Sequence, residues 1–247
     1  MNGLKKTMEY FTAGPPSTTA DFRVPLVLLA GMNCTDDLWS GCGLEGSITP
    51  ALDEPAMDAQ VEALLDILPV RFALAGLSLG GIVGMALCRQ APERVVRLCL
   101  MSTNAKGPTQ LQRDGWSSWR ERLAAGETPR DLQRDILDAL LSAPARDRDS
   151  GLAERVLRMG DDTGAARLDA QLRMQATRGD ELASLPELRI PVLVVSGTAD
   201  AICPPPFHRD IAAAVPGARL ASVDAGHLSP MERPEDVGRL LRSWLNV

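Results

Sequence analysis

The sequence has few residues of the kinds that build metal sites or disulfide frameworks. Its 247 residues include two histidines and five cysteines, and no two cysteines form a Cys-x-x-Cys pair. Apart from Cys34 and Cys42, the cysteines lie far apart, and the histidines do not complete a ligand pattern with them. This spacing is not that of zinc ligands or of a small disulfide-linked domain. We therefore expect free or buried thiols and no metal site.

Long apolar runs and an excess of positive charge are also absent. No apolar run reaches the length of a membrane span. The opening MNGLKKTMEYFTAGPP has two lysines without the apolar segment of a secretory signal. The net charge is −6 with both signs scattered along the chain, which gives no basic surface for nucleic acid or an acidic membrane. We expect a cytoplasmic protein that binds neither nucleic acid nor a membrane.

Short apolar runs alternate with helical periods over most of the chain. Hydrophobic residues make up 45% and charged residues 23%, as in ordinary globular proteins, so the chain can bury a substantial core. Alternating strands and helices predict an α/β fold, with a mostly parallel sheet flanked by helices. The expected strands cover residues 24–30, 72–75, 95–101, 190–195 and 220–223, and the expected helices cover 57–68, 81–89, 207–215 and 235–245.

Residues 104–185 follow a different pattern. They show only helical periods, such as Leu132 and Ile136, and they are rich in Arg and Asp. We interpret this segment as an all-helical insertion that lies over one end of the sheet as a lid. The predicted division is a core of residues 1–103 and 186–247, and a lid of residues 104–185.

The lid is expected to shape the substrate pocket. Trp116, Trp119, Met159 and Met174 are candidates to line it, although such residues also form the core of helical domains. The many arginines of the segment are expected on solvated faces. One of them could meet a substrate carboxylate, but the sequence does not single it out.

The stretch FALAGLSLGG, residues 72–81, places one serine among glycines between an expected strand and an expected helix. Strand, tight turn and helix around Gly-x-Ser-x-Gly is the context of a nucleophile turn. Ser78, at the apex, then has a strained backbone, and Gly76 and Gly80 are small because the strand and the helix nearly touch. A merely structural turn could use the same glycines, so the motif needs partners before it indicates catalysis.

A serine nucleophile needs a base, and the chain offers two histidines. His227 lies in DAGHLSPMERPE, between the last expected strand and the last expected helix, where loops of an open α/β sheet carry chemistry. His208 lies within the helix PPPFHRDIAAAV, and we expect it on the helix surface or facing the lid. His227 is therefore the predicted base.

The base in turn needs a carboxylate that fixes its tautomer and stabilises the imidazolium. Asp200 follows the fourth expected strand in a loop rich in Gly and Pro, GTADAICPP. Asp224, three residues before His227, is expected to order its own loop, and Asp161–Asp162 are expected to begin a helix. The end of the third expected strand is another place from which an acid could reach the histidine, but there the chain has Asn104. Asp200 is the predicted acid; alternatively, it could have only the structural role of stabilising its turn.

In the order Ser78, Asp200 and His227, the chain resembles the α/β-hydrolase superfamily. Three segments carry the resemblance: GLSLGG with the following APERVVRLCLMST, then PVLVVSGTADAICPP, then PGARLASVDAGHLSPMERPEDV. It extends from about Val24 to the C-terminus and weakens across the helical insertion. The resemblance implies the α/β-hydrolase fold, whose sheet usually begins with an antiparallel pair of strands. The 23 N-terminal residues are short for such a pair, so we expect that edge of the sheet to be reduced.

In this superfamily two backbone amides form the oxyanion hole. One follows the nucleophile and here belongs to Leu79. The other lies after a strand that ends in His-Gly, where this chain has LLAGMN, and belongs to Met32. Ala30 replaces the usual His, a change that backbone donors can survive. Asn33 is expected to hydrogen-bond within its own loop.

The resemblance implies two-step acyl transfer by a Ser–His–Asp triad, with no metal or organic cofactor. The main expectation is a serine esterase that acts on a small or medium carboxylic ester or lactone. The segment RLCLMSTNAKGPT is similar to enol-lactonases of aromatic catabolism. A carbon–carbon bond hydrolase of vinylogous diketones would use the same triad. A non-catalytic small-molecule receptor on the same fold is a further alternative.

Overall fold

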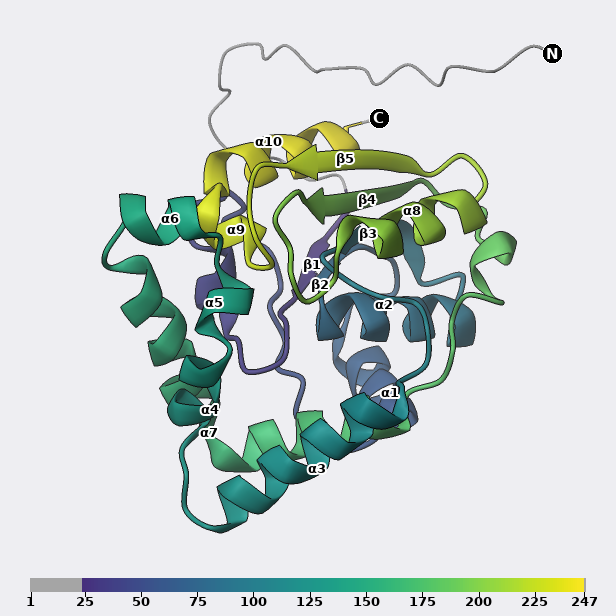
Figure 1. The fold of residues 1–247 in the computed structure, drawn as a ribbon. Coiled ribbons are helices and arrows are strands. Elements are labelled where there is room, and N and C mark those ends of the chain that lie inside the picture. The colour runs from purple at the N-terminus through teal and green to yellow at the C-terminus, as the bar shows by residue number, and fades with distance from the viewer. Residues whose placement is uncertain (1–23, 247) are drawn as a thin grey trace, which may run out of the picture.

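Five parallel strands form the centre of the molecule (Figure 1). The computed structural model describes residues 24–246, so the reduced sheet edge expected from the preceding residues lies outside the described part. Neighbouring strands pair in chain order and in parallel, which requires a crossover between each pair. The strands are β1 (Leu26–Leu29), β2 (Phe72–Leu77), β3 (Val95–Met101), β4 (Val192–Gly197) and β5 (Arg219–Val223).

Both faces of the sheet are covered, which explains why its inner strands read as continuous apolar runs. Side chains of β1 alternate between two cores, with Leu26 and Leu28 in one and Val27 and Leu29 in the other. Helices that connect successive strands complete the core around Val27: α1 (Met57–Ile67), α2 (Leu79–Gln90) and α8 (Pro205–Ala214). The core around Leu26 is completed by η1 (Asp36–Trp39), α9 (Ser229–Glu232) and α10 (Pro234–Leu245).

A group of helices follows β3 and precedes β4 along the chain, and it projects from the sheet (Figure 1). They are α3 (Gln110–Ala124), α4 (Pro129–Asp135), α5 (Leu137–Leu140), α6 (Ala143–Arg148) and α7 (Leu152–Thr177), and η2 (Leu185–Glu187) then leads to β4. The long helix α7 packs against α3 and α4 and is kinked at Gly164, whose φ of 74° and ψ of 158° are not helical. Asp161–Asp162 lie inside α7, before the kink, so the expectation that they begin a helix is wrong.

Two threonines determine where the first helices of this group begin. The Thr109 hydroxyl accepts from the Gln112 amide, while the Gln112 side chain accepts from the Thr109 amide. Thr128 and Asp131 repeat this arrangement at the start of α4. Each reciprocal pair satisfies two backbone N–H groups that a helix start leaves without partners. Pro129, at the first position of α4, has no such group to satisfy.

The observed elements confirm the predicted fold of a parallel sheet flanked by helices. Residues 95–101 form β3 as expected, and β2 extends beyond the expected strand to Leu77. The five cysteines are free and buried, also as expected. Among residues 24–246, no helix combines the length and apolar character that a bilayer crossing requires.

The turn from β2 into α2 has no room for side chains on its glycines. A Cβ on Gly76 would lie 2.3 Å from the carbonyl oxygen of Gly80, and a Cβ on Gly80 would lie 2.2 Å from the carbonyl oxygen of Leu29. Cβ atoms do not approach backbone this closely, so the three segments can meet only with glycine at both positions. The contact brings β1, β2 and α2 together around Ser78.

Gly80→Ala is expected to lower the free energy of unfolding by about 3 kcal/mol, because its Cβ would overlap backbone that cannot move without separating β1 from α2. Gly115→Ala is the matched control. Gly115 lies in α3 with nothing within 4 Å of an added Cβ, and alanine favours a helix by about 1 kcal/mol. Urea unfolding of the two variants checks the difference, and equal stabilities would argue against the close contact.

Candidate active site

Ser78 lies at the apex of this turn in a backbone conformation that L-residues rarely adopt, with φ 55° and ψ −114°. Its amide donates to the Met101 carbonyl at 2.9 Å. Its carbonyl accepts from the amides of Gly81 and Ile82 and from the Thr103 hydroxyl. These bonds hold a conformation that costs roughly 1–3 kcal/mol. The side chain stays partly exposed at the N-terminus of α2, where the helix dipole favours negative charge.

Asp200 and His227 form a buried pair. Nδ1 of His227 lies 3.0 Å from each carboxylate oxygen of Asp200, and both residues are 3% exposed. Asp200 Oδ1 also accepts from the amides of Ile202 at 2.9 Å and Cys203 at 2.8 Å. Burial raises the pKa of Asp200, but attraction to His227 and these hydrogen bonds together hold the pKa below its ordinary value. The ionised carboxylate keeps a proton on Nδ1 of His227 and leaves Nε2 able to accept another.

The carboxyl ends of three strands carry the predicted site residues. Ser78 follows β2, Asp200 lies in the loop after β4 and His227 lies in the loop after β5. Parallel strands end at the same edge of a sheet, so all three residues lie at that edge. The structure brings Asp200 and His227 into direct contact. Asp224, the rival acid, is exposed and pairs with Arg233 at 3.1 Å instead.

The helices between β3 and β4 contact the His227 loop directly. The amides of His227 and Leu228 both donate to the Leu140 carbonyl at 3.1 Å. Glu232 is buried and ties the loop to the start of α6, because Oε1 accepts from the Ser142 amide and Oε2 from the Ser142 hydroxyl. Glu232 was not predicted from the sequence, because a bond between residues so far apart leaves no spacing pattern. The available signal was Ser142 ahead of Ala-Pro, which is typical of a helix N-cap.

The loop after β1 runs beside Ser78. A Cβ on Gly31 would lie 3.4 Å from the Cβ of Ser78, and the next amide in the loop is that of Met32. Among residues 24–246, neither the Met32 amide nor the Leu79 amide donates to a protein acceptor. Both amides predicted for the oxyanion hole are therefore without a protein acceptor, the Leu79 amide directly after Ser78 and the Met32 amide directly after Gly31.

The expectation that Asn33 bonds within its own loop is wrong. Its Nδ2 donates to the Pro129 carbonyl at 2.9 Å and to Gln133 Oε1 at 2.8 Å, both in α4. Its amide donates to Gln171 Oε1 in α7 at 2.8 Å. Asn33 is buried, and the helices packed over the loop supply partners for its amide and for Nδ2, whereas its Oδ1 has no partner among the described residues. The loop that carries the Met32 amide is thus held by α4 and α7.

The expectation that His208 lies on a surface is also wrong, because the side chain is fully buried. It shares a face of α8 with Ile211, which packs into the core beneath the sheet. His208 Nε2 accepts from the Thr103 amide at 3.0 Å, and the Thr103 hydroxyl donates to the Ser78 carbonyl at 2.8 Å. Burial lowers the pKa of His208 to about 4 and outweighs the attraction of Asp200. A neutral His208 therefore supports the nucleophile turn through Thr103.

None of the four residues considered for the pocket lines the cavity described below, and they differ in where they pack. Trp116 and Trp119 are partly buried, and they pack with Met32 against the same small helical cluster. Met159 and Met174 are fully buried in the two main cores. The tryptophans therefore share a cluster with the loop that runs beside Ser78.

A cavity of about 420 Å³ opens beside this loop. Gly31 and Cys34 line it from the loop, and Arg167 and Gln171 line it from α7. Gly31 borders both the cavity and Ser78. The volume is within the range of small-molecule sites in proteins.

Known proteins share both the sequence pattern and the fold of this chain. A sequence profile described as alpha/beta hydrolase family matches residues 21–240. The chain belongs to this family. It is 30% identical over 245 residues to the pimeloyl-[acyl-carrier protein] methyl ester esterase of Aromatoleum aromaticum, a match that covers 89% of this chain and 97% of that protein.

Solved structures of α/β hydrolases are similar in fold. An esterase from Thermogutta terrifontis, determined with malate bound, is 25% identical with a TM-score of 0.83, over 93% of this chain and 91% of that one. The enol-lactonase from Burkholderia xenovorans is 21% identical with a TM-score of 0.78, over 93% of this chain and 94% of that one. The predicted α/β-hydrolase fold is confirmed, and the esterases among these relatives agree with the predicted hydrolase class.

The buried, neutral His208 predicts a pH dependence of stability. Below pH 6.5 the unfolded chain binds a proton at this imidazole, whereas the folded protein does not until about pH 4. The free energy of unfolding therefore falls as the pH decreases through this range, by about 3 kcal/mol at most. The glutamine of His208→Gln can still accept from the Thr103 amide through its side-chain oxygen but does not titrate. In this variant the part of the decrease in unfolding free energy that comes from His208 is therefore expected to disappear.

Urea unfolding of wild type and His208→Gln at several pH values between neutrality and pH 4 measures the component. Other groups titrate in both proteins, so their contributions cancel when the free energy of unfolding of His208→Gln is subtracted from that of the wild type at each pH. Parallel pH profiles for the two proteins would show that His208 is not held neutral.

Proposed function

We propose that this protein is a serine hydrolase that cleaves carboxylic esters through Ser78, His227 and Asp200. The observation that carries the proposal is the buried His227–Asp200 pair at the sheet edge where Ser78 occupies its strained turn. The carboxylate orients the imidazole and stabilises its protonated form, which makes Nε2 an effective base. Membership in the alpha/beta hydrolase family supports the same assignment.

Catalysis then proceeds as two acyl transfers. Nε2 of His227 takes the hydroxyl proton of Ser78 while Oγ of Ser78 bonds to the ester carbonyl carbon. The π electrons of the carbonyl move onto its oxygen. The amides of Met32 and Leu79 stabilise that oxyanion, each by about 3 kcal/mol in the transition state. The oxyanion collapses, the bond to the leaving alcohol breaks, and His227 gives its proton to the alcohol. Water repeats the sequence on the acyl-enzyme, releasing the acid and restoring Ser78.

We assign residues 104–185 as a lid that positions this machinery. Two sets of hydrogen bonds support the assignment. Asn33 joins the loop of the Met32 amide to α4 and α7, and the Leu140 carbonyl holds the amide of His227. A lid connected in this way helps to fix the distance between the oxyanion donors and the base.

Esters with a small alcohol and a small or medium acyl group are the proposed substrates. The Aromatoleum relative is named for a methyl ester, and the cavity beside Gly31 has room for an acyl chain of this size. A lactone is the second candidate, because the same chemistry opens a cyclic ester and the segment 97–109 is similar to enol-lactonases.

Ser78→Ala and His227→Ala are each expected to lower turnover of p-nitrophenyl esters by roughly six orders of magnitude, because a triad acts as a unit. Asp200→Asn is expected to lower the same turnover by about four orders of magnitude. Labelling of the wild type by a fluorophosphonate is lost in Ser78→Ala. Asp224→Asn is the control and keeps its activity, since the exposed Asp224 pairs with Arg233 and not with His227.

Different outcomes would redirect the assignment. Full activity in Asp200→Asn would place the acid elsewhere. A folded wild-type protein that is neither labelled nor active would be a small-molecule receptor on the same fold. Cleavage of a vinylogous diketone without cleavage of any ester would identify a carbon–carbon bond hydrolase.

A further inference from the structure

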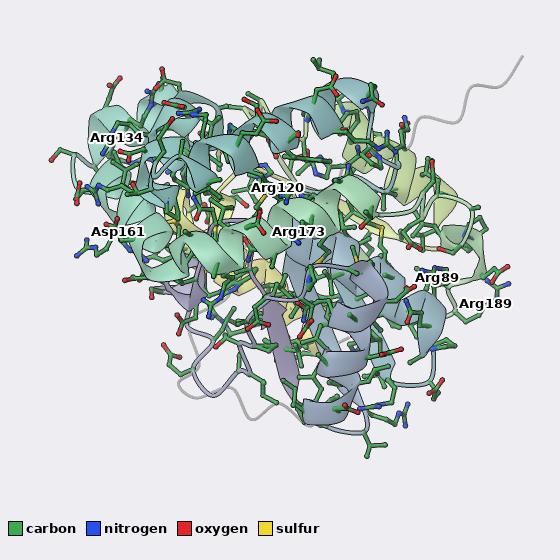
Figure 2. The ribbon with its side chains drawn as sticks, turned by 90° about the horizontal axis from the view of Figure 1, so that it is seen from below. Arg89, Arg120, Arg134, Asp161, Arg173 and Arg189 are labelled. Atoms are coloured by element: carbon green, nitrogen blue, oxygen red, sulfur yellow. The ribbon has the colours of Figure 1, made fainter. Side chains whose placement is uncertain are left out.

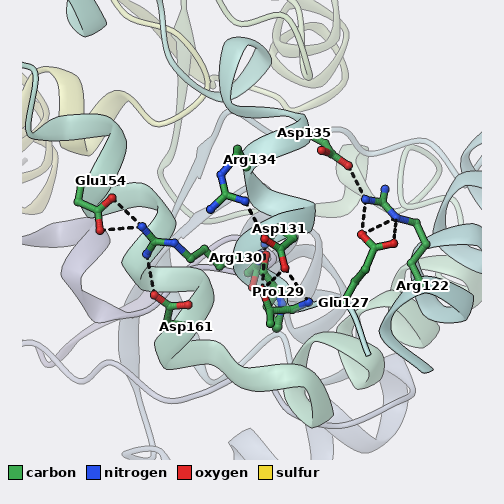
Figure 3. Close-up of polar contacts among 11 residues, drawn as sticks. Arg122, Glu127, Pro129, Arg130, Asp131, Arg134, Asp135, Glu154 and Asp161 are labelled. Atoms are coloured by element: carbon green, nitrogen blue, oxygen red, sulfur yellow. Dashed lines mark hydrogen bonds and ion pairs between the residues drawn. The ribbon is translucent and has the colours of Figure 1, made fainter. Parts of the chain in front are cut away.

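Most arginines of the lid have carboxylate partners. Figure 3 shows three of them with their acids: Arg122, Arg130 and Arg134. Arg120 of α3 and Arg173 of α7, both labelled in Figure 2, pair with the same carboxylate, that of Asp169. These side chains are partly or largely exposed, so ordinary surface ion pairs account for them.

Arg178, the residue after α7, is different. It is 6% exposed, and within residues 24–246 no carboxylate pairs with it. Nη1 donates to Gln175 Oε1, Nη2 donates to the Lys106 carbonyl at 3.4 Å, and the guanidinium carbon lies 5.4 Å from the centre of the Trp116 ring. Nε is buried and has no partner among the described residues. A buried cation with only neutral acceptors is unfavourable unless something supplies the counter-charge.

Its neighbours belong to the elements that surround the candidate active site. The loop after β3, which supplies the Lys106 carbonyl, also bonds to the nucleophile turn. Trp116 packs with Met32 against the same helical cluster. Cys203 is close enough to Arg178 for electrostatic interaction, and it belongs to the loop of the proposed acid. Arg178, at the end of α7, therefore lies near the loops that follow β3 and β4.

The guanidinium keeps its charge in this setting. Burial lowers the pKa of Arg178 to about 10, which still leaves it protonated at neutral pH. Arg113 contributes a second positive charge nearby, and burial raises the pKa of the Cys203 thiol so that it stays neutral. Arg178 therefore has a second cation nearby and no carboxylate paired with it among the described residues, which suits it to an anionic ligand.

We propose that Arg178 binds a carboxylate carried by the substrate, so that half-esters of dicarboxylic acids are preferred over neutral esters. This inference rests on the ester hydrolysis proposed above. The Nε hydrogen and the free Nη2 hydrogen form the edge of a guanidinium that a carboxylate engages with two parallel hydrogen bonds. Such a ligand supplies the missing counter-charge and gives Nε its partner.

The test compares methyl esters of matched length with and without a second carboxylate. Monomethyl succinate, glutarate and adipate are set against methyl butanoate, pentanoate and hexanoate. The wild type is expected to have the higher kcat/KM on the half-esters. Arg178→Gln is expected to lower that value by roughly ten- to one-hundredfold while leaving the neutral esters nearly unchanged.

Two further variants separate charge recognition from structural damage. Arg178→Lys keeps the charge and is expected to retain part of the preference for half-esters. Arg173→Gln removes a 52% exposed arginine of α7 and is expected to keep the full preference. If Arg178→Gln does not fold, as judged by circular dichroism, the wild-type preference and its partial loss in Arg178→Lys decide the question.

Calorimetric binding of glutarate and adipate gives a readout that needs no turnover. Weaker binding to Arg178→Gln than to the wild type supports the inference, and equal binding overturns it. Hydrolysis through Ser78 with no preference for half-esters would defeat the inference and leave the proposed function standing. If neither ester series is hydrolysed, the proposed function fails, and the calorimetry alone decides whether Arg178 recognises a carboxylate.

Discussion

The backbones of β1, β2 and α2 meet around Ser78 at distances that exclude side chains. Glycine at positions 76 and 80 is the condition for that meeting. Met101 and Thr103, at the end of β3 and just beyond it, hold the apex in a conformation with positive φ. The position of the hydroxyl is therefore set by the rigid sheet, and the remaining groups of the site need only be brought to it.

Those remaining groups lie on loops that hydrogen-bond to the helices of residues 104–185, which we propose form a lid. Asn33 connects the loop of the Met32 amide to two lid helices, and the Leu140 carbonyl holds the loop of His227. Both connections are backbone or amide hydrogen bonds in buried surroundings, where a lost partner costs more than at a surface. Under the proposed function, a change in the packing of these helices is expected to move the Met32 amide and His227 more than Ser78.

The sequence was sufficient to predict the parallel sheet and the tight turn from β2 into α2, because both depend on local pattern, and it also placed Ser78, Asp200 and His227 after strands that end at one edge of that sheet. It was not sufficient for His208 or Asn33. Their partners come from elements over 90 residues away, and only the packing of α8 and of the lid decides which way they face. Arg178 was one arginine among many until burial and the missing carboxylate distinguished it.

The most direct test of the Ser78, His227 and Asp200 assignment is a crystal structure of the protein after reaction with a fluorophosphonate. The expected adduct is a covalent bond from phosphorus to Ser78 Oγ, with the phosphoryl oxygen within hydrogen-bonding distance of the Met32 and Leu79 amides and Nε2 of His227 facing Oγ. An adduct on any other residue, or a phosphoryl oxygen turned away from both amides, would contradict it.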